Sequence, residues 1–464
     1  MDAIMKLNGV INGIVWGPWM LALIVGTGVY LTLVLGLPQF RYFALMFKEV
    51  FGNLGKKKEG EGAISSFAAL STALAATVGT GNIAGVATAL HLGGPGALFW
   101  MLVSAFFGMT TKMAEVTLAV RYREKDETGN WRGGTMYILE KGANQKWLAW
   151  IFALFGFFAS FGIGCAVQAN STAEGFNLGF GIPHLWTGII VAILTGLVII
   201  GGLKRISDVT TYLVPFMAIF YIVGAAIVIF MHADQIPAAL ANAVKYAFND
   251  PKAMPGALAG WAVKIALTKG IARGVFSNEA GLGSAPMVHA TAVVDHPVRQ
   301  GMYGLFEVFV DTIVICSLTA FAILTSGVLT TQPELSGAKL SLFAFSSVLG
   351  GVGTMILSVG LALFAFSTVL GWYWYSETCG TYIFGPKVIP VLKTLWIALV
   401  VLGASGGEIL GNAAGFLTNL WDLSDTLNGL MAAPNLIALL ILSGEMRKLV
   451  KDFDEKRHSG KIKV

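Results

Sequence analysis

Charged residues are scarce in this sequence. Only 12% of its 464 residues are Asp, Glu, Lys or Arg, whereas 55% are hydrophobic. Soluble globular proteins carry about twice that charged fraction, because their surfaces face water. The shortage excludes a string of soluble domains and predicts a single domain embedded in a membrane.

Cysteine and histidine are also rare. Cys165, Cys316 and Cys379 lie inside apolar segments without paired spacing, and the six histidines form no metal-binding motif. These cysteines read as small buried side chains rather than as disulfides or metal ligands. The apolar segments contain no Ser/His or paired Asp constellation. We therefore expect neither an enzyme nor a bound cofactor.

Long hydrophobic runs are abundant. A helix needs about 20 mostly apolar residues to cross the hydrocarbon core of a bilayer. Eleven such runs can be read, at residues 14–36, 66–92, 95–120, 147–178, 184–203, 210–231, 257–295, 300–327, 352–379, 387–404 and 426–443. They predict an all-α, multi-pass protein of about eleven transmembrane helices, surrounded by membrane lipid.

The lysines and arginines between these runs are distributed unevenly between the two sides of the membrane. If the N-terminus is outside, most of them gather in inner segments, including 56–58, 121–132 and the basic tail 445–464. Cytoplasmic loops carry such an excess of Lys and Arg. The net charge of +5 therefore reflects topology, and no nucleic-acid partner is expected. We predict a protein of the cell membrane with a cytoplasmic C-terminal tail.

Two of the runs contain residues that interrupt helices. Run 66–92 includes Val-Gly-Thr-Gly-Asn at residues 78–82, and run 257–295 includes several glycines followed by Pro286. Glycine weakens a helix interior, and proline removes a hydrogen bond. Irregular backbone at membrane depth is tolerated where it is buried in protein or lines a cavity. Close helix packing by small residues is the alternative for either run alone.

The positions of the two interruptions are informative. After an N-terminal helix within residues 1–40, ten runs remain in two sets of five, 64–232 and 255–444, and each set begins with an interrupted run. Five crossings are an odd number, so the second set is inverted relative to the first. Interrupted helices at matching positions of inverted halves indicate a transporter's binding site near the midplane. This pattern favours a carrier over a channel.

Three stretches carry a family resemblance: GTGNIAGVATAL (79–90), GGPGALFWMLVSAFFG (93–108) and RGVFSNEAGLGSAP (273–286). They resemble signature stretches of the alanine/glycine:cation symporter family, although Leu102 stands where that family usually has a second tryptophan. The resemblance extends over nearly the whole chain. It implies a leucine-transporter-like five-plus-five inverted repeat with one additional N-terminal helix. It also implies sodium-coupled symport of alanine and glycine; a proton-coupled amino-acid transporter of the same fold is the alternative.

A zwitterionic amino acid needs donors for its carboxylate and acceptors for its ammonium group. Amides where a half-helix begins suit the carboxylate, and carbonyls near the second interruption suit the ammonium group. Two mid-span amides and aromatic walls would complete the pocket, although such amides also serve as bonds between helices. We predict substrate contacts from Gly79, Thr80, Gly81, Asn82, Gln168, Asn170, Gly274, Val275, Phe276 and Trp372.

Sodium prefers oxygen ligands. The leucine-transporter resemblance implies an ion site formed by the carbonyls of Ala75, Val78 and Phe364 and the hydroxyls of Ser367 and Thr368. Hydrogen bonds from these two hydroxyls to carbonyls of their own helix are the alternative. A second sodium site would use Thr77, Asn82 and Ser277. Charged residues within spans indicate an ion-pair network, a gate or a proton relay; they are Lys269, Arg273, Glu279, Glu307 and Asp311.

Overall fold

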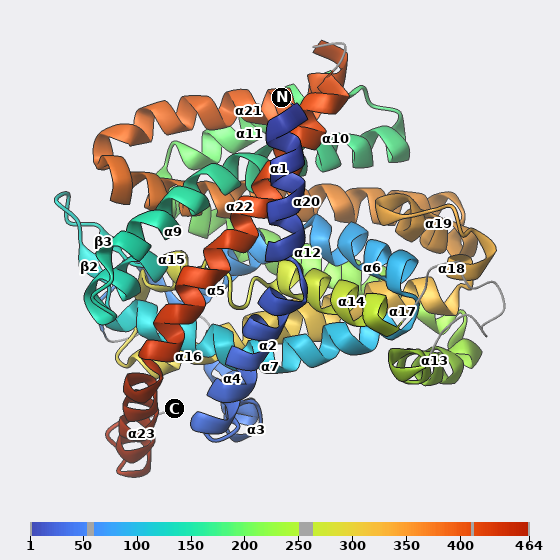
Figure 1. The fold of residues 1–464 in the computed structure, drawn as a ribbon. Coiled ribbons are helices and arrows are strands. Elements are labelled where there is room, and N and C mark those ends of the chain that lie inside the picture. The colour runs from blue at the N-terminus through green and yellow to red at the C-terminus, as the bar shows by residue number, and fades with distance from the viewer. Residues whose placement is uncertain (1, 53–59, 250–262, 410–412, 463–464) are drawn as a thin grey trace.

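The computed structural model describes residues 2–52, 60–249, 263–409 and 413–462. These residues are mostly helical, as the composition predicts (Figure 1). The strands in the described part form two short ladders. In one, β1 (Ile64–Ser65) pairs in parallel with β4 (Ala292–Val293). In the other, β2 (Glu124–Lys125) pairs antiparallel with β3 (Trp131–Arg132).

The chain begins with α1 (Asp2–Val15), α2 (Pro18–Val34), α3 (Pro38–Arg41) and α4 (Phe43–Gly52). The first two form one apolar helical stretch, Ile4–Val34. Pro18 occupies the first turn of α2, where its missing N–H costs no helical hydrogen bond. This stretch corresponds to the predicted N-terminal helix.

The segment predicted as the first set of five runs contains helices and short 3₁₀ or π-helical segments, which are labelled η. They are α5 (Ser66–Thr77), η1 (Gly81–Gly85), α6 (Val86–Gly93), α7 (Gly96–Arg121), α8 (Thr135–Tyr137), η2 (Ile138–Gly142), α9 (Lys146–Ala159), η3 (Ser160–Ala166), α10 (Val167–Phe180), α11 (His184–Ile199) and α12 (Gly202–Phe230). The connection that follows contains η4 (Ala233–Gln235) and α13 (Ile236–Phe248).

The segment predicted as the second set begins at residue 255, and residues 255–262 lie outside the described part of the chain. Its elements are α14 (Val263–Asn278), α15 (Pro286–His289), α16 (Pro297–Val308), η6 (Phe309–Cys316), α17 (Ser317–Thr325), α18 (Val328–Thr331), α19 (Gly337–Leu349), α20 (Gly351–Phe384), η7 (Pro386–Val388), α21 (Ile389–Ile409) and α22 (Ala413–Ile441). The basic tail forms α23 (Ser443–His458).

The predicted count of eleven spans is not confirmed. Among the described residues, seven helices are long and apolar enough to cross a membrane, or up to nine if each of two bent pairs is one span. The difference arises partly at α11, which has only 16 residues. It also arises at α14, whose described part has 16 residues and includes Lys264, Lys269 and Arg273.

Large apolar side chains cover the outside of the helical assembly. On α11 and α12 they include Ile190, Ile193, Leu197, Phe216 and Ile219, all of which are exposed. An apolar surface of this extent is unfavourable in water but suits hydrocarbon. The surface therefore agrees with a multi-pass membrane protein.

Both predicted interruptions are present. The first lies between Thr77 and Gly81, where the helix bends by 52°. The second begins only after Asn278, because the helix continues through the expected end near Phe276. There the backbone of Glu279 takes a left-handed conformation (φ 56°), which residues other than glycine rarely adopt.

The two interrupted helices lie side by side near the middle of the molecule (Figure 1). α14 packs against α6 and α7, and α5 packs against α12 and α20. The pairing of β1 with β4 joins the start of α5 to the segment after α15. The contact between α14 and η1 brings the two breaks close to each other.

Candidate functional site

A small buried cavity lies between the two breaks. Its volume is about 20 Å³, on the order of the space that one water molecule needs. The lining comes from the α5–η1 break, η3 with α10, the end of α14, α20 and α22. The lining residues are Ala76, Thr77, Gly79, Thr80, Gly81, Ile163, Gln168, Phe276, Glu279, Thr368, Trp372 and Asn428.

One end of this central cavity is the beginning of a helix. The helix Gly81–Gly93 starts at the cavity wall, and Thr80, at its N-cap position, makes no side-chain capping bond. The first amides of a helix have no intrahelical acceptor, and the helix dipole favours negative charge there. This end therefore suits a carboxylate.

Hydrogen-bond acceptors lie elsewhere on the cavity wall. Among the described residues, the buried amide oxygens Gln168 Oε1 and Asn428 Oδ1 have no hydrogen-bond partner. The Gln168 side chain is held by its Nε2, which donates to the Ile163 carbonyl at 3.0 Å. A buried acceptor without a donor is costly. These two oxygens therefore suit a ligand that carries several N–H donors.

Glu279 supplies a carboxylate to the same wall. Its Oε1 accepts from Trp372 Nε1 at 3.1 Å, and its Oε2 accepts from the Ser284 hydroxyl. The side chain is therefore fixed in position, and its carboxyl group lines a cavity that also offers amide oxygens. This combination suits an ammonium group.

Four of the residues predicted for the sodium site lie together where α20 passes the first break: Ala75, Phe364, Ser367 and Thr368. Ser367 Oγ donates to the Phe364 carbonyl at 2.9 Å and lies 3.2 Å from the Ala75 carbonyl. Thr368 Oγ1 also donates to the Phe364 carbonyl, at 2.9 Å. Val78, the fifth predicted residue, directly follows the last residue of α5. Carbonyl and hydroxyl oxygens are the ligands that hard cations prefer.

Two residues of the second predicted sodium site meet at a carboxylate. Asn82 Nδ2 donates to Asp311 Oδ1 at 2.7 Å, and Ser277 Oγ donates to Asp311 Oδ2 at 2.9 Å. The Thr77 hydroxyl instead donates to the Ala73 carbonyl of its own helix, at 3.2 Å. Sequence reasoning had assigned Asp311 to a network of charges without placing it here.

Buried charge near the breaks is mostly negative. Lys112 forms an ion pair with Glu307 at 3.3 Å, and neither side chain is exposed. The same ammonium group interacts electrostatically with Glu115 and Glu279. Lys269 and Arg273 do not join this ion pair but line a different cavity. A surplus of buried carboxylates favours binding of a cation.

Comparison with known proteins identifies the family. The model of the sodium:alanine symporter family matches residues 1–464. The chain belongs to this family. It is therefore a multi-pass membrane transporter that couples amino-acid transport to a cation, and not an enzyme.

Relatives within the sodium:alanine symporter family align along almost the whole chain. The sodium/alanine symporter AgcS of Methanococcus maripaludis is 45% identical, with 98% of each chain covered. The "probable sodium/glutamine symporter GlnT" of Bacillus subtilis is 39% identical over 98% of this chain and 92% of its own. The resemblance inferred from the three sequence stretches is confirmed.

Solved structures share the fold. MhsT in complex with L-phenylalanine aligns with a TM-score of 0.55 at 16% identity, covering 85% of this chain and 97% of that one. A manganese transporter of Eremococcus coleocola also aligns with a TM-score of 0.55, at 11% identity and 84% and 82% coverage. Their likeness agrees with the leucine-transporter-like fold expected for this sodium:alanine symporter family member.

Asn82 and Asn170 do not line the central cavity. Asn82 faces the break instead, because its Oδ1 accepts from the Gly79 amide at 2.8 Å while its Nδ2 donates to Asp311. We had expected the Gly79 amide to be free for a ligand, but this hydrogen bond occupies it. Asn170 lies half-buried on α10.

Gly274 and Val275 are also away from the cavity, because α14 continues past them. A Cβ at Gly274 would lie 2.7 Å from Ser104 Oγ, so this glycine allows α14 to pack closely on α7. The Val275 carbonyl accepts from the Glu279 amide at 2.8 Å. Of the three expected contacts Gly274, Val275 and Phe276, only Phe276 lines the cavity.

Sequence reasoning missed Ile163 and Asn428, and it did not assign Glu279 to the pocket. An asparagine in the last apolar run is costly in a membrane unless it is paired, and this was a usable signal for Asn428. The left-handed backbone of Glu279 had no equivalent signal in the sequence. Ile163 is an ordinary apolar residue, so only the fold identifies it.

The glycines at the first break matter for the room that they leave to neighbouring side chains, and not for backbone angles that only glycine adopts. Neither Gly79 nor Gly81 has a positive φ. A Cβ at Gly79 would lie 2.5 Å from Thr368 Oγ1, whereas a Cβ at Gly81 would lie 3.5 Å from Phe276, an ordinary contact. Gly79 is therefore a position at which the close approach of the first break to α20 requires the absence of a side chain.

Proposed function

We propose that this symporter moves Na⁺ and a small neutral amino acid, alanine or glycine, together by alternating access to the central cavity. The observation that carries the proposal is the polarity of that cavity. An uncapped helix start lies on one wall, and the unpartnered oxygens of Gln168 and Asn428 lie on others. The carboxylate and ammonium group of an amino acid complement these features.

The size of the cavity supports a small substrate. Phe276, Trp372 and Ile163 wall a space of about 20 Å³, which has to widen before it can hold even alanine or glycine. Close-packed walls resist larger changes of volume. Glutamine and leucine should therefore compete poorly with alanine, although one relative is named as a glutamine symporter.

Sodium as the coupled ion is supported by the oxygen ligands around Ser367 and by the name of the family. Proton coupling is the second candidate. It is favoured by Asp311, a fully buried carboxylate whose hydrogen bonds come from neutral side chains, Asn82, Ser277 and Thr312. A protonated Asp311 would carry no charge into the membrane interior.

We infer that the N-terminus lies outside and the C-terminus inside the cell. Asn12 of the helical stretch Ile4–Val34 bonds to Asp425 of α22. Farther along, Tyr30 of the same stretch bonds to Ser443, the first residue of α23, just after the end of α22. The two helices therefore run in the same direction. The basic helix α23 follows at the opposite end from residue 2, as the excess of cytoplasmic Lys and Arg would require.

Uptake by purified protein in liposomes tests the proposal. Labelled alanine should accumulate when an inward Na⁺ gradient is imposed, and a protonophore should leave this accumulation intact. A matched K⁺ gradient provides the control. Accumulation driven by a pH gradient without Na⁺ would support the proton alternative, and absence of alanine uptake under both gradients would contradict the proposal.

A further inference from the structure

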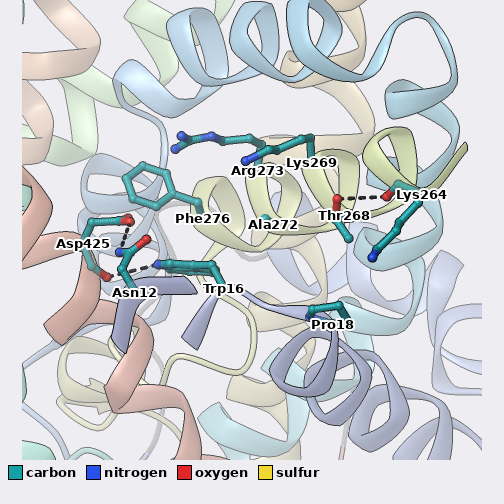
Figure 2. A pocket seen from close by; sticks show the side chains of 10 residues that line it. All are labelled: Asn12, Trp16, Pro18, Lys264, Thr268, Lys269, Ala272, Arg273, Phe276 and Asp425. Carbon is teal, nitrogen blue, oxygen red and sulfur yellow. Dashed lines mark hydrogen bonds between the residues drawn. The ribbon is translucent and has the colours of Figure 1, made fainter. Parts of the chain in front are cut away.

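A second, larger cavity adjoins the central one. It has a volume of about 270 Å³ and lies between α14, the end of α1 and α22. Figure 2 shows its lining residues, which are Asn12, Trp16, Pro18, Lys264, Thr268, Lys269, Ala272, Arg273, Phe276 and Asp425. With the proposed topology it opens toward the outside, and we call it the outer cavity.

The outer cavity has walls of opposite charge. The helix α14 presents Lys264, Lys269 and Arg273 to the cavity, while α22 presents Asp425. In Figure 2, Asp425 lies at one end of the cavity and Lys264 at the other. Arg273 and Asp425 are close enough to interact electrostatically, yet they form no direct ion pair among the described contacts. The two charges are therefore separated across a space that a small ligand can enter.

The N-terminal helix holds Asp425 in place. Asn12 Nδ2 donates to Asp425 Oδ2 at 2.9 Å, and Trp16 Nε1 donates to the Asp425 carbonyl at 3.2 Å. These bonds fix the carboxylate at the cavity wall. They also give the additional N-terminal helix, which lies outside the predicted five-plus-five repeat, a contact with the permeation path.

Phe276 separates the outer cavity from the central cavity, because its side chain lines both. The guanidinium carbon of Arg273 lies 5.5 Å from the centre of the Phe276 ring, and the Trp16 ring approaches that ring edge-on at 6.4 Å. An amino acid that occupies the outer cavity therefore contacts the groups that hold this aromatic barrier.

We propose that the outer cavity is a second binding site for the zwitterionic amino acid, which docks there before Phe276 moves. Its carboxylate binds Arg273, whose planar guanidinium suits two parallel hydrogen bonds, and its ammonium group binds Asp425. The central cavity has room for about one water molecule in this structure, whereas the outer cavity has ample volume for alanine. This inference rests on the proposed function, because it takes an amino acid as the substrate.

The test measures how fast alanine associates with the purified symporter at saturating Na⁺, by stopped-flow tryptophan fluorescence, together with its equilibrium affinity. Arg273→Gln and Asp425→Asn should each slow association at least fivefold. The equilibrium affinity of both variants for alanine should stay within twofold of the wild type, because the central cavity is unchanged. Lys339→Gln and Asp234→Asn are matched controls, since they remove one exposed charge each, from α19 and η4. Both controls should associate at the wild-type rate.

Two results would contradict the proposal that the outer cavity binds the amino acid. Unchanged association in Arg273→Gln and Asp425→Asn would show that neither charge contacts the incoming amino acid. Faster association in Arg273→Gln would show that Arg273 only holds Phe276 closed. If Arg273→Gln does not fold, Arg273→Lys and Asp425→Asn provide the same comparison. Failure of the wild type to bind alanine would instead contradict the proposed function.

Discussion

At the scale of single residues, Gly79 and Gly81 differ in what a methyl group would meet. At Gly79 the added carbon would lie 2.5 Å from Thr368 Oγ1, and at Gly81 it would make ordinary contact with Phe276. We expect Gly79→Ala to weaken alanine binding at least tenfold, about 1.4 kcal/mol, because Thr368 must move. Gly81→Ala should have a smaller effect. Isothermal titration at saturating Na⁺ checks this order, and equal losses in both variants would contradict it.

The predicted sodium site depends on the hydroxyl groups of Ser367 and Thr368. Their hydroxyls converge with the carbonyls of Ala75 and Phe364 beside the first break. Ser367→Ala combined with Thr368→Ala should reduce sodium-driven alanine uptake at least tenfold, to the level seen without sodium. Each lost hydrogen bond costs only about 0.5–1.5 kcal/mol, so the protein should remain folded. Uptake by reconstituted protein at varied Na⁺ concentration measures the effect.

The matched control for this pair is Ser358→Ala, because Ser358 is buried in the same helix, α20, but lies outside the ion site. It should retain the wild-type sodium dependence. If the double variant retains that dependence as well, the ion lies elsewhere. The carboxylate of Asp311, with Asn82 and Ser277, would then be the site to examine.

At the scale of elements, the second break places an acid in a strained conformation. Glu279 has φ 56° and its carboxylate lines the central cavity; such strain costs on the order of 1–3 kcal/mol and is typical of functional sites. If Glu279 receives the substrate's ammonium group, Glu279→Gln should weaken alanine binding at least tenfold while keeping the side chain's size. Titration of alanine measures the loss, and Glu334→Gln, an exposed residue between α18 and α19, is the control. Wild-type affinity in Glu279→Gln would restrict Glu279 to a structural role.

The two interruptions themselves could be predicted, but not all of the side chains around them. Glycine and proline act locally, so the sequence indicated both breaks, and the aromatic residues Phe276 and Trp372 followed from them. Asn82 lies outside the central cavity, because its amide bonds across the break to Gly79 and to Asp311, a residue far along the chain. The end of α14 was expected too early, since close packing of Gly274 on α7 keeps that part helical. Both differences from the expected positions arise from tertiary contacts that override local preference.

At the scale of the whole molecule, the distribution of basic residues and the parallel course of the first and last long helices predict the topology. Lys339 on α19 should face the outside, and Lys448 on α23 should face the cytoplasm. The native cysteines Cys165, Cys316 and Cys379 are buried, so a cysteine introduced at an exposed position should dominate labelling. Lys339 and Lys448 are both exposed. Lys339→Cys should react with a membrane-impermeant maleimide in intact cells, whereas Lys448→Cys should react only after permeabilisation. The reverse pattern would invert the proposed topology and would place the outer cavity on the cytoplasmic side.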